Sequence, residues 1–222
     1  MANEVILLDF PVSMFAARIR IGLAEKGTDY ERIEEHPWNK GPLLLHMNPI
    51  HKKIPVFIHN GKPIPESLII LEYIDEVWND DKAPLLLPSD PYQKAQARFW
   101  ADFIDKKVNS FWTKVIWKVK GEEHGAGKKE LLDSLKLLEA ELGNKPYFGG
   151  DSFGFLDIAL VGFYPWFRVL ETCAGFSIGA ECPKLIAWAK TCLQKESVSK
   201  SLADEKEIDE YVAEMRKKIG IE

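Results

Sequence analysis

Cysteine is scarce in this sequence: the 222 residues hold three, Cys173, Cys182 and Cys192, all in the last quarter. Their number is odd and no Cys-x-x-Cys pair occurs, which argues against a disulfide framework and against a thiolate zinc site. We expect each cysteine to be a small buried apolar residue. The histidines show neither a His-Glu-x-x-His motif nor paired helical spacing, so we expect no metal ion.

Long apolar runs and an excess of positive charge are also missing. The longest apolar runs, such as Val5–Leu8 and Leu68–Leu71, are far shorter than a membrane span requires. No basic segment followed by an apolar stretch opens the chain, so we expect a cytosolic protein without a secretory signal or membrane partner. The net charge is -5, which gives no reason to expect binding to nucleic acid.

The first third of the chain alternates strand and helix patterns. The continuous apolar run Val5–Leu8 is typical of a strand covered on both faces. A helix is predicted from Met14 to Lys26, with Gly27 as its C-terminal cap. Asn60-Gly61 is a strong hairpin turn. The other predicted elements are strands at 30–34, 54–58 and 62–65 and helices at 43–47 and 66–78. This order predicts a compact α/β domain with helices packed on a sheet.

A polar, proline-rich segment then separates this part from the rest. We interpret it as a linker at 80–90 between one domain at 1–79 and another at 91–222. Beyond it no strand pattern is convincing, so the second domain is predicted to be all-helical. Its predicted helices cover 92–120, 128–143, 156–172, 183–195 and 204–219.

Ser13 is the first residue whose place suits chemistry. It follows a buried strand and opens a helix, where serine commonly serves only as an N-cap. Strand ends that lead into helix starts are also where α/β folds bind ligands. From position alone, both interpretations of Ser13 stay open.

Two further features favour a charged peptide ligand. Ile54 precedes Pro55 at a strand start, where it can offer its backbone to an extended peptide or simply form a turn. Glu66-Ser67 opens a helix, and a helix N-terminus can hold a carboxylate while Glu66 binds an ammonium group. A plain helix cap is the alternative. Lys40 and Lys53 are either carboxylate partners or solvated lysines.

Taken in this order, these features make the sequence resemble the plant tau class of glutathione transferases over essentially the whole chain. The stretches that carry the resemblance are Val5–Phe15, Arg18–Gly27, Asn48–Ile58, Pro65–Leu68 and Tyr147–Leu160. The resemblance implies an α/β thioredoxin-like N-terminal domain, an all-α C-terminal domain and a homodimer. It also implies conjugation of glutathione, as co-substrate and without a cofactor, to hydrophobic electrophiles in the detoxification of xenobiotics.

Residue by residue, the resemblance implies that Ser13 is catalytic and donates a hydrogen bond to the glutathione thiolate. The glutathione-binding residues that it implies are Lys40, Lys53, Ile54, Glu66 and Ser67, with Pro55 in the cis form. The chain departs from the class at Met14, where proline is common. In Gly154-Phe155-Leu156-Asp157 a glycine stands at a helix cap, and Asp157 is expected to serve folding.

The residues that bind the electrophile are harder to identify from the sequence. Three candidates follow the first strand, three share one face of the predicted long helix by their spacing, and three come from the resemblance. They are Phe10, Met14, Phe15, Asn109, Thr113, Ile116, Trp166, Tyr211 and Met215. Packing in the core or on the surface is the alternative for each.

Two other functions compete with conjugation. A thiol transferase or dehydroascorbate reductase on this scaffold needs a nucleophilic cysteine, but Ser13 stands at that place and the predicted first domain contains none. Glutathione-dependent reduction of hydroperoxides stays open, because it needs only the glutathione thiolate. A non-catalytic carrier of hydrophobic ligands is the second alternative.

Overall fold

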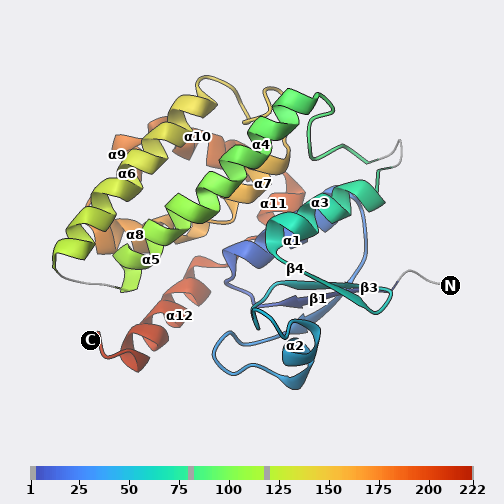
Figure 1. Ribbon diagram of the computed structural model, residues 1–222. Coiled ribbons are helices and arrows are strands. Elements are labelled where there is room, and N and C mark those ends of the chain that lie inside the picture. Colours follow the sequence, from blue (N-terminus) through green and yellow to red (C-terminus); the bar gives the residue numbers. More distant parts are fainter. Residues whose placement is uncertain (1–3, 80–82, 118–120, 222) are drawn as a thin grey trace.

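The computed structural model describes residues 4–79, 83–117 and 121–221, and these form two units (Figure 1). The first, called here the sheet unit, covers residues 4–79. The second, the helical unit, covers the described residues from 83 onward. The elements of the sheet unit are β1 (Val5–Asp9), α1 (Met14–Glu25), β2 (Glu31–Glu34), α2 (Pro42–Met47), β3 (Val56–His59), β4 (Lys62–Pro65) and α3 (Ser67–Val77).

The sheet has the strand order β2-β1-β3-β4, with β1 parallel to β2 and antiparallel to β3. Leu7 of β1 packs into a cluster with residues of α1 and α3, whereas Leu8 packs with Leu44 of α2 on the other face. The continuous apolar run is therefore explained by helices on both faces, as predicted. Asn60 and Gly61 both have positive φ angles, 51° and 74°, which suit the predicted hairpin turn.

The helical unit contains no regular strand among its described residues, which confirms the predicted all-helical character. Its elements are α4 (Pro91–Phe103), the π-helical segment η1 (Ile104–Val108), α5 (Asn109–Trp117), α6 (Glu122–Leu142), α7 (Phe155–Val161), the short 3₁₀ helix η2 (Tyr164–Trp166), α8 (Phe167–Ala174), α9 (Ile178–Glu181), α10 (Pro183–Cys192), α11 (Glu196–Ser199) and α12 (Glu205–Lys218). None of the helices in the described ranges is long and apolar enough to cross a bilayer.

Several predicted helices differ from those observed. The predicted helix 92–120 runs through α4, η1 and α5, and its last three residues lie outside the described ranges. The predicted helix 156–172 is broken between α7 and α8, where Pro165 lies in a 3₁₀ turn. The four-residue helices α9 and α11 were not predicted, because helices this short carry no periodic pattern.

The described part of the predicted linker is packed against the sheet unit, while residues 80–82 lie outside the described ranges. Leu86 and Leu87 are buried, and both of their N–H groups donate to the carboxylate of Asp75, at 2.8 and 2.9 Å. Lys26 forms an ion pair with the same carboxylate at 2.7 Å. The segment therefore fixes one unit against the other.

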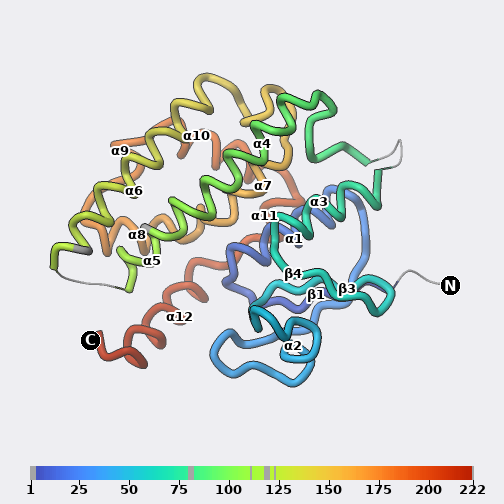
Figure 2. Tube along the Cα trace, in the orientation of Figure 1, coloured from blue at the N-terminus to red at the C-terminus, as the bar shows by residue number. Residues whose placement is uncertain are grey.

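Helix α1 lies where the two units meet, as the Cα trace also shows (Figure 2). A Cβ added to Gly162, at the end of α7, would lie 2.5 Å from the carbonyl oxygen of Met14. The Trp166 indole, in the helical unit, donates to the Val12 carbonyl at 3.1 Å. The helical unit therefore touches the chain on both sides of Ser13.

The cysteines follow the prediction in two cases of three. Cys182 and Cys192 are buried, and burial raises the pKa of Cys182 to about 11 and that of Cys192 further. Cys173 was predicted to be buried but is only half-buried, and its sulfur accepts from Arg216 at 3.5 Å. In the ranges that the structure describes, no group of three or more His, Cys, Asp and Glu side chains is placed to hold a metal ion.

Candidate active site

The loop between β1 and α1 is held by a buried ion pair. The carboxylate of Asp9, the last residue of β1, accepts from Arg20 at 2.6 and 2.8 Å. Arg20 also donates to the Pro11 carbonyl at 3.0 Å and to the Ser201 carbonyl at 2.8 Å. These bonds fix the loop directly before Ser13.

Ser13 is the N-cap of α1, so the ordinary interpretation of this residue is confirmed. Its Oγ accepts a hydrogen bond from the backbone N–H of Ala16 at 3.1 Å. This bond uses a lone pair of the oxygen and leaves the hydroxyl proton available to donate to a ligand. Ser13 is half-buried and lines a cleft, so capping does not exclude a chemical role.

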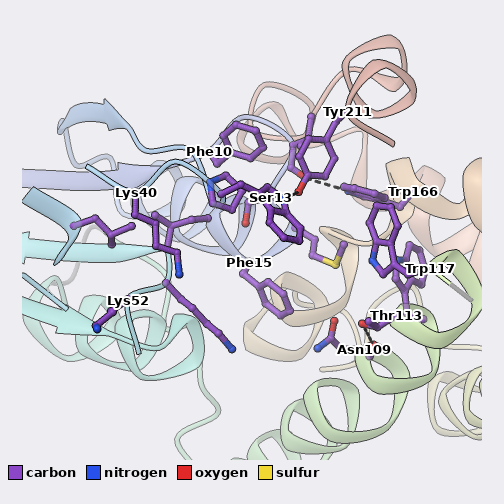
Figure 3. Close-up of a pocket in the computed structure, with 18 residues that line it drawn as sticks. Phe10, Ser13, Phe15, Lys40, Lys52, Asn109, Thr113, Trp117, Trp166 and Tyr211 are labelled. Carbon is purple, nitrogen blue, oxygen red and sulfur yellow. Dashed lines mark hydrogen bonds between the residues drawn. The ribbon is translucent and has the colours of Figure 1, made fainter. Parts of the chain in front are cut away.

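The cleft lies between the two units and has a volume of about 590 Å³ (Figure 3). Its lining residues are Phe10, Val12, Ser13, Met14, Phe15, Pro37, Trp38, Lys40, Leu44, Lys52, Lys53, Ile54, Asn109, Trp112, Thr113, Trp117, Trp166 and Tyr211. All but two of the residues expected around the electrophile are therefore brought together here.

The two exceptions are Ile116 and Met215, which do not line the cleft. Both are buried, Ile116 at 0% and Met215 at 1% exposure. Helical spacing placed Ile116 near Asn109 and Thr113, but it cannot tell which part of that face is covered by other helices. The prediction that Ile116 and Met215 line the electrophile site is therefore wrong: both side chains are packed in the interior.

A second cavity of about 250 Å³ adjoins the cleft. The two cavities share Phe15, Lys53, Ile54 and Asn109. The second cavity adds Asn48, Pro55, Glu66, Ser67 and Asp105. Together with Lys40 in the cleft, every residue expected to bind glutathione thus lines one of two joined hollows.

The charged end of the second cavity is formed where α3 begins. Glu66 has a φ of 73°, an unusual left-handed value for a residue with a side chain. Ser67, the first residue of α3, is buried, and its Oγ accepts from Arg18 at 2.9 Å. Arg18 is fully buried and forms two further bonds to the Asp105 carboxylate, at 2.7 and 3.2 Å. Residues of both units therefore meet at Ser67.

The loop before β3 is held by Asn48, which was not among the predicted binding residues. Asn48 is buried, donates to the Lys53 carbonyl at 3.0 Å and accepts from the N–H of His51 at 3.1 Å. The Ile54–Pro55 peptide bond is cis, as the resemblance implied. Ile54 lines both cavities.

Charge and apolar surface occupy different parts of the cleft. Figure 3 shows Lys40 and Lys52 on one side and Trp117 and Trp166 on the other, with Ser13 between them. Lysines at one end attract carboxylates, whereas the aromatic end suits an apolar group. Sequence reasoning missed Lys52, and it also missed the ring-bearing residues of the wall that lie outside its nine candidates. Those rings are Trp38, Trp112 and Trp117.

Comparison with known proteins identifies this arrangement. Residues 3–76 match the family model "Glutathione S-transferase, N-terminal domain", and residues 95–191 match "Glutathione S-transferase, C-terminal domain". The chain is 62% identical to glutathione S-transferase U25 of Arabidopsis thaliana, over 100% of this chain and 99% of the relative. It is 63% identical to the probable glutathione S-transferase parC of Nicotiana tabacum, over 100% of both chains.

Two solved structures are also similar. One is rice GST1 in complex with glutathione, with a TM-score of 0.91 and 43% identity over 98% of both chains. The other is a tau-class glutathione S-transferase from mango, with a TM-score of 0.88 and 41% identity over 95% of this chain and 97% of that one. The chain belongs to the tau class of the glutathione S-transferases.

Proposed function

We propose that the chain binds glutathione across the two joined cavities and conjugates its thiolate to a hydrophobic electrophile held in the aromatic cleft. The observation that carries the proposal is the position of Ser13, which lies between the lysine end and the aromatic end of the cleft, and this cleft adjoins the cavity that contains Glu66 and Ser67. In this proposal residues 1–79 form the glutathione-binding domain, 80–90 the linker, and 91–222 the domain that completes the electrophile site.

The charges of the tripeptide match those of the cavities. Glutathione carries an ammonium group and a carboxylate at one end and a second carboxylate at the other. Glu66 and Ser67 suit the first end, because an acidic side chain binds an ammonium group and a hydroxyl at a helix start binds a carboxylate. Lys40 and Lys53 suit the second carboxylate. Ile54, between them, suits the peptide backbone, and the rice relative was solved with glutathione.

Ser13 would activate the sulfur as a hydrogen-bond donor. A free thiol has a pKa near ~8.5 and is only a few per cent ionised at neutral pH. A donated hydrogen bond favours the thiolate, and lowering the thiol pKa by about two units requires about 2.7 kcal/mol. One charge-assisted hydrogen bond supplies about 1.5–3 kcal/mol, so a single hydroxyl is nearly sufficient.

The chemical step needs no further reagent. The thiol proton passes to solvent and the thiolate attacks the electrophilic carbon. With an aryl chloride, a carbon–sulfur bond forms, the carbon–chlorine bond breaks, and chloride leaves with the electron pair. Holding both reactants in adjoining cavities supplies the remaining acceleration.

The test is conjugation by the purified chain. With chlorodinitrobenzene, product should form only when glutathione is present, and S-hexylglutathione should inhibit competitively against glutathione. A chain that binds an apolar dye in the cleft but forms no conjugate with any of several electrophiles would be a carrier of hydrophobic ligands instead.

We also propose a homodimer, supported by an exposed apolar surface on α3 and α4. Ile69, Tyr92 and Phe99 are 58%, 72% and 57% exposed. Large side chains this exposed on adjoining helices are a common sign of an interface. Sedimentation should give twice the chain mass, and Phe99→Glu should give monomers.

The three free cysteines are consistent with a reducing compartment, and we place the enzyme in the cytosol.

A further inference from the structure

The loop between β2 and α2 is closed by its own hydrogen bonds. The Glu35 carboxylate accepts from the N–H of Gly41 at 2.8 Å. His36 accepts twice, at Nδ1 from the N–H of Trp38 at 3.2 Å and at its carbonyl from the N–H of Asn39 at 3.2 Å. These bonds form a compact loop with Trp38 near its tip.

Trp38 extends from this loop to the helical unit. Trp38 is 62% exposed, yet it lines the cleft, and its indole N–H donates to the hydroxyl of Tyr211 at 3.3 Å. Figure 2 shows the loop on the side of the sheet unit that faces α12. Helix α12 itself is anchored, because Ile208 and Met215 are buried in the packed interior.

Tyr211 also belongs to a chain of aromatic contacts along the cleft. Its ring centroid lies 5.4 Å from that of Phe10 and 6.2 Å from that of Trp166. Phe10 in turn lies 5.1 Å from the ring of His36, in the same loop as Trp38. The hydrogen bond to Trp38 therefore closes a ring of aromatic side chains that begins and ends on one loop.

We propose that Trp38 and Tyr211 form an aromatic bridge that determines which electrophiles the cleft accepts, favouring flat aromatic compounds over long flexible ones. A flat ring can lie against the aromatic wall while the indole N–H stays bound to the hydroxyl. A long chain that leaves the cleft on this side must displace the indole and break that bond. The kinetic part of this inference rests on the proposed conjugating activity.

Two variants remove the hydrogen bond and keep an aromatic ring at each position. Trp38→Phe removes the indole N–H, and Tyr211→Phe removes the hydroxyl. Without the bond the side chain at position 38 is free to leave the cleft wall, so the KM for chlorodinitrobenzene should rise for each variant, by about fivefold if fixing that wall is worth one neutral hydrogen bond. The kcat/KM for hydroxynonenal, a long-chain alkenal, should stay constant or rise. The KM for glutathione should not change, although Lys40 lies two residues from Trp38.

The double variant tests whether the two residues act together. If one bond is responsible, Trp38→Phe with Tyr211→Phe should show the same fivefold loss as either substitution alone. Matched controls are Trp78→Phe and Tyr164→Phe, because neither residue lines the cleft. Both controls should keep the ratio of the two kcat/KM values at the wild-type level.

Dye binding separates failure of the bridge from failure of the proposed function. Without glutathione, anilinonaphthalene sulfonate should bind each single variant about fivefold more weakly than the wild type. A wild type that conjugates neither electrophile would refute the proposed function, and the dye would still test the bridge. The bridge is refuted if the losses multiply in the double variant, if the substrate ratio is unchanged, or if only the KM for glutathione moves.

Discussion

The guanidinium of Arg18 donates to the hydroxyl of Ser67 across 2.9 Å, and its other hydrogen bonds reach two helical segments of the other unit. Arg18 comes from α1, the helix that Ser13 caps, and Ser67 opens α3. The same guanidinium binds Asp105 in η1 and the carbonyl of Ala159 in α7. One buried side chain therefore sets the position of the α3 start relative to Ser13.

Asp105→Asn should weaken both the fold and glutathione binding. The substitution leaves the buried Arg18 charge without its counter-charge. Because the Asp105 side chain is 33% exposed, we expect a cost of about 2 kcal/mol, below the ~3–5 kcal/mol of a fully buried pair. Because Arg18 then no longer fixes Ser67, the KM for glutathione should rise about tenfold, while the KM for the electrophile changes little. Urea unfolding and steady-state kinetics measure the two effects.

The matched control for Asp105→Asn is Asp102→Asn. Asp102 pairs with Lys106 at 2.9 Å on the same helical stretch, but both side chains are exposed. An exposed pair contributes less than about 1 kcal/mol, so this variant should behave like the wild type. Equal effects of the two substitutions would rule out a special role for the buried pair.

Ser13→Ala should reduce kcat/KM by about 10- to 100-fold, the loss expected for one charge-assisted hydrogen bond. The KM for glutathione should stay within about twofold, because the charged ends of the tripeptide bind elsewhere. The hydroxyl lowers the thiol pKa, so its removal should move the rising limb of the pH–rate profile to higher pH by about 1–2 units.

A control for Ser13→Ala must account for its second role. Loss of the N-cap bond to Ala16 should cost about 1 kcal/mol of stability. Ser13→Thr keeps a hydroxyl and a capping oxygen, so it should keep most of the activity and the wild-type pH profile. An alanine variant with an unshifted profile would contradict the proposed role of the hydroxyl.

The parts of the site that could be predicted from the sequence are those set by local structure. Ser13 caps a helix a few residues after a strand and Ser67 opens one, and that pattern is visible in the order of residues. Arg18 and Arg20 were not singled out, because charged residues in a helix are usually exposed. Their burial depends on Asp105 and Asp9, and only the folded chain shows that these carboxylates face them.

The aromatic wall was predictable only in part, for a related reason. Helical spacing identified Asn109 and Thr113 but also included Ile116, because periodicity defines a face without showing what covers it. Trp38 lies in a loop, where no periodicity exists, and its place in the cleft depends on the hydrogen bond from its indole N–H to Tyr211 of α12. Contacts between distant segments therefore decide which residues complete the cleft.

Gly162→Ala should reduce kcat more than it changes either KM. The added methyl group would lie 2.5 Å from the Met14 carbonyl oxygen, a backbone atom beside Ser13. The start of α1 must shift to relieve this clash, and a small displacement of a catalytic group costs up to about 100-fold in rate. Steady-state kinetics together with a thermal melt would separate a local shift from unfolding.

The control for Gly162→Ala is Gly125→Ala in α6, where an added Cβ meets no atom within 4 Å. Alanine is the better helix former there, so this variant should be more stable by up to about 1 kcal/mol and fully active. A Gly162→Ala enzyme with wild-type kcat would show that the contact with Met14 does not position Ser13.

Asp157 should make the stability of the fold depend on pH in a direction opposite to that of most carboxylates. Its side chain accepts from the N–H groups of Phe148 and Gly154 and from the Trp188 indole, at 2.9, 3.0 and 2.7 Å. Burial nevertheless raises the pKa of Asp157 to about 6, against the lowering effect of these bonds. The folded state therefore binds a proton more tightly than the unfolded state.

The sign of the effect follows from this difference. The stability contributed by the bound proton is complete below the unfolded pKa near ~3.9 and is lost as the pH rises through about 6. Asp157→Asn should be less stable than the wild type. The asparagine N–H₂ is a donor, and it would face an N–H group whose hydrogen bond the carboxylate accepts. That deficit should shrink by roughly 1 kcal/mol between pH 5 and pH 8, since the wild type loses the proton and asparagine cannot.

Urea unfolding of both proteins at the two pH values measures this change. Asp151→Asn, in an exposed turn just before α7, serves as the control and should differ from the wild type by less than about 0.5 kcal/mol at either pH. A deficit that grows with pH would mean that the three hydrogen bonds outweigh burial, and that the carboxylate stays ionised in the folded protein. The direction of the change thus decides whether burial, which raises the pKa of Asp157, or its hydrogen bonds, which lower that pKa, has the larger effect.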